Sequence, residues 1–384
     1  MSPFRTGIVT SPLGESGRTP LSNLVEVVAD RCGPVYLVTG NAGLDFFHDS
    51  TRTTVSGIRH REGYHPLSRI VRNAHMQLRL ALLVVRHAKF VDTWIFFFGG
   101  DGLVIPMVIA KLTGKNALLA LPASEEQMLR AADDRFYKLV RVVSDINRRL
   151  STRLVVYTWR LVNEWHLERY RSKISIAHHH FVDFTRFRPM RRLKDRENLV
   201  GYVGRMNEEK GVLQFVRAIP EAIKRDPTLG FVIAGDGPLG NTVREYIGRL
   251  ALGETVRMTG WITHSDLPSL LNELKLIVIP SYTEGWPSVM LEAMACGTPV
   301  LATPVGGIPD VIREGETGFM MENNSPESIA SNVIRVLESS DLEQVAERAN
   351  AYVQGNFTFE KAADSWRRVI EGPWTAARAI QDRA

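Results

Sequence analysis

The chain has 384 residues, of which 44% are hydrophobic and 23% charged, and its net charge is +5. This length exceeds the size at which a single hydrophobic core keeps growing, so two domains are expected, and the balanced composition excludes an intrinsically disordered protein. The two cysteines, Cys32 and Cys296, are too few for a disulfide framework, and no apolar run approaches the roughly 20 residues that a membrane-spanning helix needs.

Short β-branched or aromatic segments alternate with helical patterns through the first half of the chain. This alternation is typical of βαβ units and parallel sheets. A polar, basic stretch at 184–197 has no hydrophobic period and is predicted to be the interdomain linker. The strands predicted before it lie at 7–10, 35–39, 53–58, 93–98, 117–121, 154–157 and 174–177.

The alternation restarts after the linker. Strands are predicted at 199–203, 230–234, 255–258, 276–279 and 299–302, and helices at 212–224, 241–251 and 287–296. From Pro326 onward the pattern is helical, and the last segment is amphipathic enough to dock back on the first domain.

The sequence therefore predicts an α/β protein with two Rossmann-like, doubly wound domains that face each other across a cleft. The predicted domains are residues 1–190 and 191–365, with a helical segment 366–384 that returns to the first domain. In such sheets ligands bind beyond the carboxyl ends of the strands.

The segment SYTEGWPSVMLEAMACGTPVLATPVGGIPD, residues 281–310, follows one of these strands and has the features of a binding loop. Pro287 suits a first helical turn, and Gly297 supplies a helix stop. A helix start has unpaired N–H groups and a positive dipole end, so it can receive a diphosphate, and Gly285 lets the backbone approach it. Glu292, on a mostly apolar helix, needs partners such as sugar hydroxyls. For either glutamate considered alone, the simpler interpretation is that Glu292 lies on a narrow solvated stripe of the helix and that Glu284 lies in an ordinary exposed loop.

The nine residues EGWPSVMLE, Glu284 to Glu292, resemble the Glu-x7-Glu motif of glycosyltransferase family 4. The flanking AMACGTPVLATPVGGIPDVI and GETGF are also similar to that family's pattern. The resemblance, strongest over 199–371, implies the GT-B fold, with the acceptor bound by the first domain and the nucleotide sugar by the second. It assigns Glu284 to the donor sugar and Glu292 to the ribose. The neighbouring donor-binding candidates are Gly285, Trp286, Pro287 and Ser288.

A second motif, GYVGRMNEEKG, ends a predicted strand and opens a helix. Gly204 permits a tight turn there, and Arg205 and Lys210 can project two cations toward a diphosphate. By itself, a basic pair at a helix start is usually a surface feature. The motif resembles the family's Gly-Arg…Lys-Gly element, which implies that both cations neutralise the departing diphosphate. Gly235 and Gly237, in AGDGPL, are expected near the nucleotide.

The first domain resembles the family less. Residues 10–17 are similar to its flexible first loop, which implies that Gly14 approaches the donor. Many relatives carry a histidine after a strand of this domain, but LLALPASEE at 118–126 has none. Asp101, in the loop after the strand predicted at 93–98, is expected to face the cleft and is the acceptor-side candidate. The run His178–His180 lacks acidic or thiol neighbours, so no metal site is predicted.

Positive charge is concentrated in the first half of the chain. Residues 1–190 contain 26 Lys plus Arg against 16 Asp plus Glu, a balance of +10, and the remaining residues contain 21 against 26, a balance of −5. This asymmetry has two explanations. The first domain binds an anionic partner, such as a phosphorylated substrate or a membrane surface, or its basic residues form a solvated surface without a partner. Two stretches, 66–90 and 133–171, mix arginine with apolar residues and can lie against anionic lipid or be ordinary core-facing helices.

Taken with these features, the resemblance to glycosyltransferase family 4 implies a retaining, metal-independent glycosyltransferase without a cofactor, located in the cytoplasm or peripherally on the inner face of the membrane. The expected donor is a UDP-sugar or GDP-sugar, and the expected acceptor is a glycan or lipid-linked glycan in cell-surface polysaccharide or glycoconjugate synthesis. Nucleic acid is not an expected partner. The alternatives are a nucleotide-sugar epimerase or phosphorylase on the same fold, or an inactive polyanion- or membrane-binding protein, which salt-sensitive polyanion binding would favour.

Overall fold

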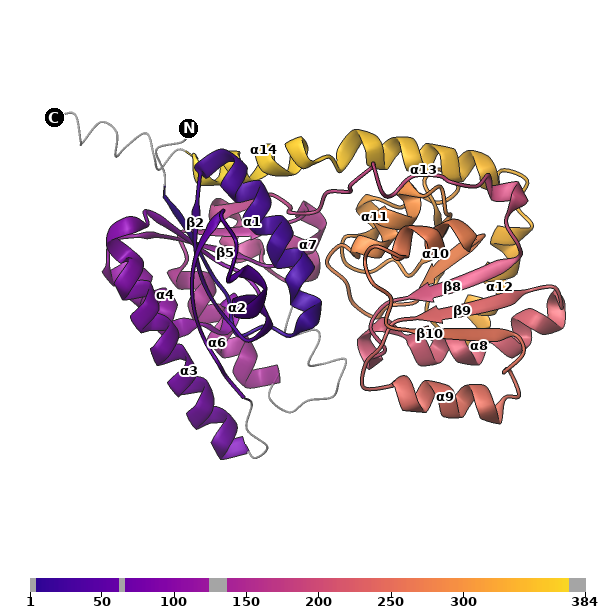
Figure 1. Cartoon of the computed structure of the whole chain (residues 1–384), viewed down its shortest axis with the longest axis horizontal. Helices are drawn as coiled ribbons and strands as arrows, with labels where there is room; N and C mark the ends of the chain where they lie inside the picture. The colour runs from indigo at the N-terminus through magenta and orange to yellow at the C-terminus, as the bar shows by residue number, and fades with distance from the viewer. Residues whose placement is uncertain (1–4, 62–65, 124–136, 373–384) are drawn as a thin grey trace. The chain divides into compact units, whose positions relative to one another are not determined.

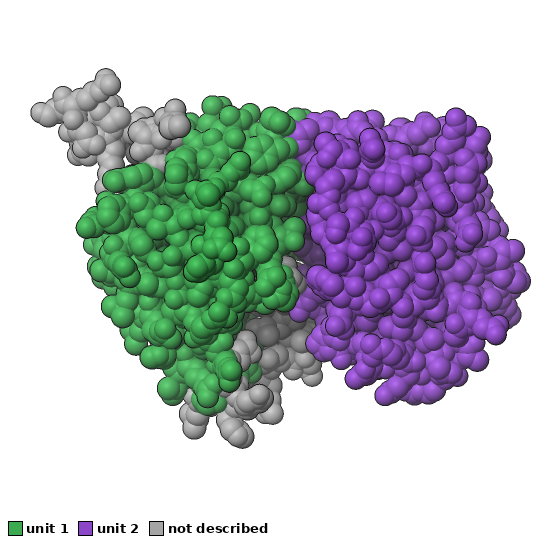
Figure 2. Space-filling model, in the orientation of Figure 1, with its two compact units in different colours: residues 1–129, 135–181, 359–384 green, residues 130–134, 182–358 purple. Residues whose placement is uncertain are grey.

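The computed structural model describes residues 5–61, 66–123 and 137–372, which form two compact units (Figures 1 and 2). Unit 1 contains the described residues up to 181 together with those from 359 onward, and unit 2 contains residues 182–358. Each unit is built on one parallel sheet with helices on its faces. Within the described ranges, no helix is long and apolar enough to cross a membrane.

The sheet of unit 1 has seven parallel strands in the order β3-β2-β1-β4-β5-β6-β7. All seven strands predicted in the first half of the chain are present, with ends shifted by a few residues. The central strands β1 and β4 are buried along their whole length, because helices cover both faces of the sheet. The strands are β1 (Thr6–Val9), β2 (Val35–Gly40), β3 (Thr53–Ile58), β4 (Thr93–Phe96), β5 (Asn116–Ala120), β6 (Arg153–Val156) and β7 (Ile174–Ile176).

The helices of unit 1 include one from the far end of the chain. This helix, α14, packs against α1 and β7, and its Trp366 lies in the same buried cluster as Leu21 and Leu24 of α1. The expected return of the C-terminal helix to the first domain is thus confirmed for α14, whereas residues 373–384 of the predicted segment 366–384 lie outside the described residues. The helices are α1 (Arg18–Cys32), α2 (Ala42–Phe47), α3 (Pro66–His87), α4 (Val104–Leu112), α6 (Tyr137–Leu150), α7 (Trp159–Glu164) and α14 (Phe359–Ile370).

The sheet of unit 2 has six parallel strands in the order β10-β9-β8-β11-β12-β13. From β8 the chain adds strands in one direction, and from β11 it adds them in the other. The carboxyl ends of β8 and β11 therefore meet at a topological switch point, where open α/β sheets bind ligands. The strands are β8 (Leu199–Val203), β9 (Gly230–Ala234), β10 (Val256–Gly260), β11 (Leu276–Ile279), β12 (Val300–Ala302) and β13 (Phe319–Met320).

Two buried clusters, one on each face of this sheet, form the core of unit 2. Helices α8, α9 and α12 contribute to one cluster, α10 and α11 contribute to the other, and α13 contributes to both. Strand β13 was not predicted, because two residues are too few to show a period. The helices are α8 (Val212–Arg225), α9 (Gly240–Arg249), α10 (Leu267–Glu273), α11 (Ser288–Ala295), α12 (Pro326–Leu337) and α13 (Leu342–Asn356).

The two units divide the chain at different residues from those predicted. The first boundary lies after residue 181 rather than after 190, and the return to unit 1 begins at 359 rather than 366. Val182 and Phe187 are buried in the core of unit 2, and the amide of Val182 donates to the carbonyl of Phe357 at 3.0 Å. Val182 lies just before the stretch predicted as a linker, and the many arginines of that stretch mask the apolar signal of Phe187.

Replacing Trp366 by alanine should destabilise unit 1 by about 3–5 kcal/mol, because a buried aromatic side chain is lost and a cavity remains. Urea unfolding of the full chain, followed by circular dichroism, measures the loss. The matched control is Trp159→Ala, since Trp159 is 48% exposed whereas Trp366 is 1% exposed. Equal losses in the two variants would contradict the packing of α14 on unit 1.

Candidate functional site

A partly buried ion pair lies at the switch point of unit 2. The ammonium of Lys210, which follows β8, donates to Oε1 of Glu284, which follows β11, at 2.7 Å. The hydroxyl of Ser281 donates to the same oxygen at 2.8 Å. The side chain of Glu284 is 7% exposed and that of Lys210 is 25% exposed. Neighbouring strands therefore deliver a fixed carboxylate and a cation that remains accessible to solvent.

The loops that carry this pair are fastened to each other through the backbone. The amide of Tyr282 donates to the carbonyl of Glu209 at 2.8 Å, which joins the loop after β11 to the loop after β8. Gly211 adopts a φ of +68°, and a Cβ there would lie 2.0 Å from the carbonyl oxygen of Pro280. Only glycine permits this approach, so the distance between Lys210 and Glu284 is set by the main chain.

A second glycine contact holds the backbone of Glu284 from the other side. Gly306 has a φ of +59°, and a Cβ there would lie 1.9 Å from the carbonyl oxygen of Glu284. The amide of Gly307 donates to the carbonyl of Gly285 at 2.8 Å, and the indole N–H of Trp286 donates to the carbonyl of Gly307 at 2.8 Å. The hydrogen bonds of Gly285 and Trp286 thus fix the loop that carries the Glu284 carboxylate.

Helix α11 begins directly after this loop and carries the second predicted carboxylate. Pro287 precedes the helix as its N-cap instead of forming its first turn, and Ser288 is the first helical residue. Oε1 of Glu292 lies 2.8 Å from Nε2 of His264, and the side chain of Glu292 is 12% exposed. Sequence reasoning missed His264, because a single histidine in a polar loop has no periodic signal.

Arg205 lies on the same loop as Lys210 but is exposed. Its carbonyl accepts a hydrogen bond of 2.7 Å from the hydroxyl of Tyr202, a residue that sequence reasoning also missed. Burial, followed by the negative charges of Glu284 and Glu209, raises the pKa of Tyr202 well above its usual range. The tyrosine therefore stays protonated and keeps holding the Arg205 turn. The structure brings Lys210 into direct contact with Glu284 and leaves the Arg205 guanidinium at the surface.

The glycines predicted near the nucleotide pack closely against the loop after β8. A Cβ on Gly235 would lie 1.9 Å from the carbonyl oxygen of Gly204, and a Cβ on Gly237 would lie 2.6 Å from that of Met206. Loop-to-loop packing alone therefore explains the absence of side chains at Gly235 and Gly237. At Gly204 itself, an added Cβ would make only ordinary contacts.

The candidates in unit 1 lie after its central strands. Gly14 caps a short 3-10 turn (Glu15–Gly17) after β1, and a Cβ at Gly14 would meet open space, so packing does not require glycine there. Asp101, after β4, is 5% exposed and forms an ion pair of 2.9 Å with the buried Arg148. It does not occupy the open position expected for an acceptor-side residue. The arginine comes from α6, and no local pattern in the sequence links it to Asp101.

The histidine run lies beyond β7 in unit 1, and the rings of His179 and His180 stack with centroids 4.4 Å apart. Burial, which disfavours the charged imidazolium, lowers the pKa of His178 to about 4 and that of His179 to about 3. Within the described ranges, no group of three or more His, Cys, Asp or Glu residues is arranged to hold a metal ion.

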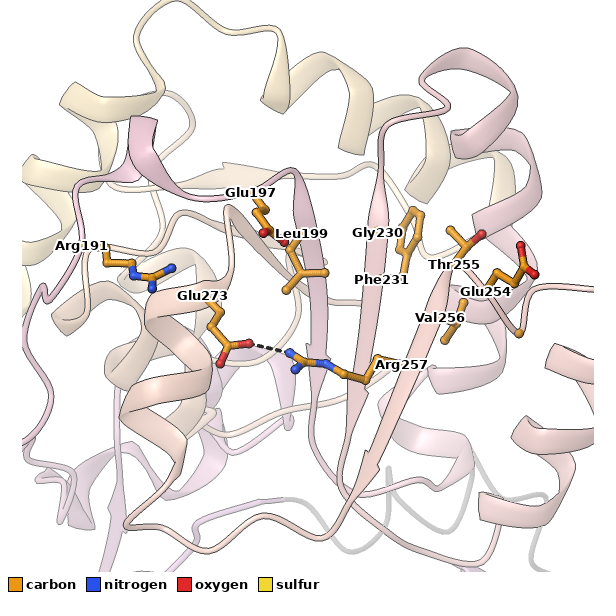
Figure 3. A pocket seen from close by; sticks show the side chains of 11 residues that line it. Arg191, Glu197, Leu199, Gly230, Phe231, Glu254, Thr255, Val256, Arg257 and Glu273 are labelled. Carbon is orange, nitrogen blue, oxygen red and sulfur yellow. Dashed lines mark hydrogen bonds and ion pairs between the residues drawn. The ribbon is translucent and has the colours of Figure 1, made fainter.

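A hollow of about 790 Å³ lies at the opposite edge of the unit 2 sheet (Figure 3). Leu199, Gly230 and Val256, at the amino ends of β8, β9 and β10, contribute to its lining. The positive and negative charges of its lining residues are nearly equal in number. Two of these residues, Arg257 and Glu273, form an ion pair of 2.5 Å. This hollow is separate from the Lys210–Glu284 pair, which lies beyond the carboxyl ends of the strands.

Comparison with known proteins connects unit 2 to one family. Residues 183–353 match the family model described as glycosyl transferases group 1. Alpha-D-kanosaminyltransferase of Streptomyces kanamyceticus is 34% identical over 171 residues, which are 44% of this chain and 44% of that protein. D-inositol 3-phosphate glycosyltransferase of Mycobacterium marinum is 31% identical over 227 residues, 54% of this chain and 47% of that protein. The chain thus spans about half the length of the curated relatives it matches.

Solved structures match almost the whole chain. Anabaena Alr3699/HepE, in complex with UDP, superimposes with a TM-score of 0.76 at 16% identity, covering 96% of this chain and 99% of that one. Sucrose-phosphate synthase from Thermosynechococcus elongatus has a TM-score of 0.75 at 19% identity, covering 97% of this chain and 100% of that one. With one seven-stranded and one six-stranded parallel sheet, the protein has the GT-B fold.

Replacing Gly306 by alanine should displace the loop of Glu284, because the new methyl group would lie 1.9 Å from a carbonyl oxygen at a strained φ. We expect a loss of stability of about 1–3 kcal/mol, measured by urea unfolding. Gly248→Ala is the matched control, since nothing lies within 4 Å of a Cβ at that helical position. Equal stability of the two variants would contradict this description of the loop.

Acidification should weaken unit 1, because its buried histidines resist protonation in the folded state. The unfolded chain binds protons from about pH 6.5 downward, whereas folded His178 and His179 bind them only near pH 4 and pH 3. The free energy of unfolding should therefore fall between pH 6.5 and pH 4, and His179→Gln should make this dependence shallower. A slope unchanged by the substitution would contradict the assignment.

Proposed function

We propose that the protein is a retaining glycosyltransferase that moves a sugar from a nucleotide-diphosphate donor to an acceptor hydroxyl without a metal ion. The Lys210–Glu284 pair at the switch point of unit 2 carries this proposal. The UDP-glucose bound by Anabaena Alr3699/HepE on the same fold favours a UDP-sugar over a GDP-sugar. The proposed acceptor is a glycan or lipid-linked glycan of cell-surface polysaccharide or glycoconjugate synthesis.

Lys210 would serve the leaving group. Its ammonium uses one donor on Glu284 at 2.7 Å, and its side chain is 25% exposed. An ammonium has three donors, so two remain for a diphosphate oxygen without release of the carboxylate. Negative charge grows on the diphosphate as the glycosidic bond breaks, and a fixed cation stabilises that charge more in the transition state than in the ground state.

Arg205 and the start of α11 would share this charge. Arg205 is exposed on the loop that carries Lys210, and α11 begins at Ser288, four residues after Glu284. A guanidinium can bind two phosphate oxygens at once, and the first N–H groups of a helix favour an anion. Together these groups would supply the positive charge that a divalent cation provides in other transferases.

The two carboxylates would bind the two sugars of the donor. Glu284 is held by Lys210 and Ser281 on one oxygen, Oε1, which leaves Oε2 to accept hydrogen bonds from the transferred sugar. Glu292 would accept from the ribose hydroxyls, with His264 fixing its orientation at 2.8 Å. An acceptor hydroxyl then attacks from the face that the diphosphate leaves, so that the anomeric configuration is retained.

The test is a transfer assay with a panel of UDP-, GDP- and ADP-sugars in the presence of a chelator. Lys210→Met and Glu284→Gln should each lower kcat by roughly 10²–10³-fold, the loss typical of one electrostatic contact to a transition state. The anomeric proton coupling of the product should show the configuration of the donor sugar. Arg257→Gln, which breaks an exposed ion pair at the other edge of the sheet, is the control and should leave kcat unchanged.

Four outcomes would contradict the proposal. Inverted products would contradict retention, and activity abolished by the chelator would contradict metal independence. Donor conversion without an acceptor product would favour the epimerase, and a requirement for free phosphate would favour the phosphorylase. Thermal unfolding of both variants shows whether a loss of activity is only a loss of fold.

A further inference from the structure

Helix α3 of unit 1 has two apolar faces, and among the described residues only one of these faces is buried. Met76, Leu80 and Val84 are buried. A second set of apolar side chains is exposed at fractions between 49% and 68%, and consists of Val71, Leu78, Leu82 and Val85. These four are spaced by seven, four and three residues, so they form one continuous stripe along the outer side of the helix.

A row of arginines runs beside this stripe. Arg72, Arg79 and Arg86 are seven residues apart, and each is exposed. The helix, Pro66–His87, contains no Asp or Glu. An exposed apolar stripe along a cationic row, with no acidic residue among them, gives α3 the side-chain arrangement of a helix that lies in a lipid headgroup layer.

Helix α6 of the same unit also carries exposed basic and apolar side chains, the basic ones including Lys138 and Arg141. Its Leu139, Val142 and Ile146 are exposed at a spacing of three and four residues. Its one acidic residue, Asp145, is paired with Arg149 of the same helix and with Arg169. Helix α4 packs against both α3 and α6, so the three helices lie next to one another in unit 1 (Figure 1).

We propose that this face of unit 1, formed by the exposed apolar and basic side chains of α3 and α6, docks on an anionic lipid surface. Docking would bury the apolar stripes at the level of the acyl chains and place the arginines among the phosphates. Helix α3 is not long and apolar enough to cross a bilayer, and it carries four arginines, so it would lie along the surface. A second copy of the chain fits less well, because its own arginine row would face this one.

This inference goes beyond the transfer reaction, since it uses none of the residues proposed to bind the donor. Its chemistry is compatible with a lipid-linked acceptor, which such docking would hold near unit 1. Because different residues carry the two proposals, either one can fail without the other.

The test is sedimentation of the full chain with vesicles of phosphatidylcholine alone or mixed with phosphatidylglycerol. We expect binding to the mixed vesicles, weakened by salt, and little binding to the neutral ones. The triple variant Arg72→Gln, Arg79→Gln, Arg86→Gln should bind about a hundredfold more weakly, since each arginine contributes roughly fivefold. The double variant Leu78→Ser, Leu82→Ser should also lose binding, at unchanged folding by circular dichroism.

The controls are Met190→Ser and Arg249→Gln, which change an exposed apolar and an exposed basic residue of unit 2 and should bind as the parent chain does. Equal binding of the parent, the controls and the α3 variants would overturn the proposal, as would absence of binding to anionic vesicles. A dimer detected by light scattering, and lost in the Leu78→Ser, Leu82→Ser variant, would assign the face to a second copy instead. Consumption of a soluble donor should be the same in all these variants.

Discussion

The arrangement of the proposed donor site depends on one contact, the ion pair between Lys210 and Glu284. Desolvating two charges costs free energy that their attraction only partly restores, so a partly buried pair is a weak source of stability. Here the surrounding backbone holds the Lys210–Glu284 pair in place. Gly211 and Gly306 allow main-chain approaches that no side chain would permit, and each approach fixes one of the two loops. A pair kept in this way at a switch point is suited to binding an anionic, hydroxyl-rich ligand.

Much of the fold could be predicted from the sequence, because parallel strands buried on both faces appear as short apolar runs between helical patterns. Every predicted strand is present, and the C-terminal helix returns to unit 1 as expected. The segment from Glu284 to Glu292 was also informative, since a proline before the helix and a glycine after it mark the ends of α11. These signals depend on residues close together in the sequence, so they can be recognised without knowledge of tertiary contacts.

The missed features arise from contacts between distant residues. The Glu292–His264 pair joins a helix to a loop 28 residues away, and the Asp101–Arg148 pair joins segments 47 residues apart. No spacing rule connects such residues. The expected place of Gly235 and Gly237 near the nucleotide stays a prediction, and the structure shows that both glycines pack against the loop after β8.

Calorimetric titration with a chelator present, comparing a nucleoside diphosphate with the corresponding nucleotide sugar, tests the role of the pair most directly. If Lys210 binds phosphate and Glu284 binds the sugar, Lys210→Met should weaken both ligands at least tenfold. Glu284→Gln should weaken only the nucleotide sugar, because the lysine that the carboxylate held becomes fully available to phosphate. Unchanged affinity of both variants for both ligands would contradict the account.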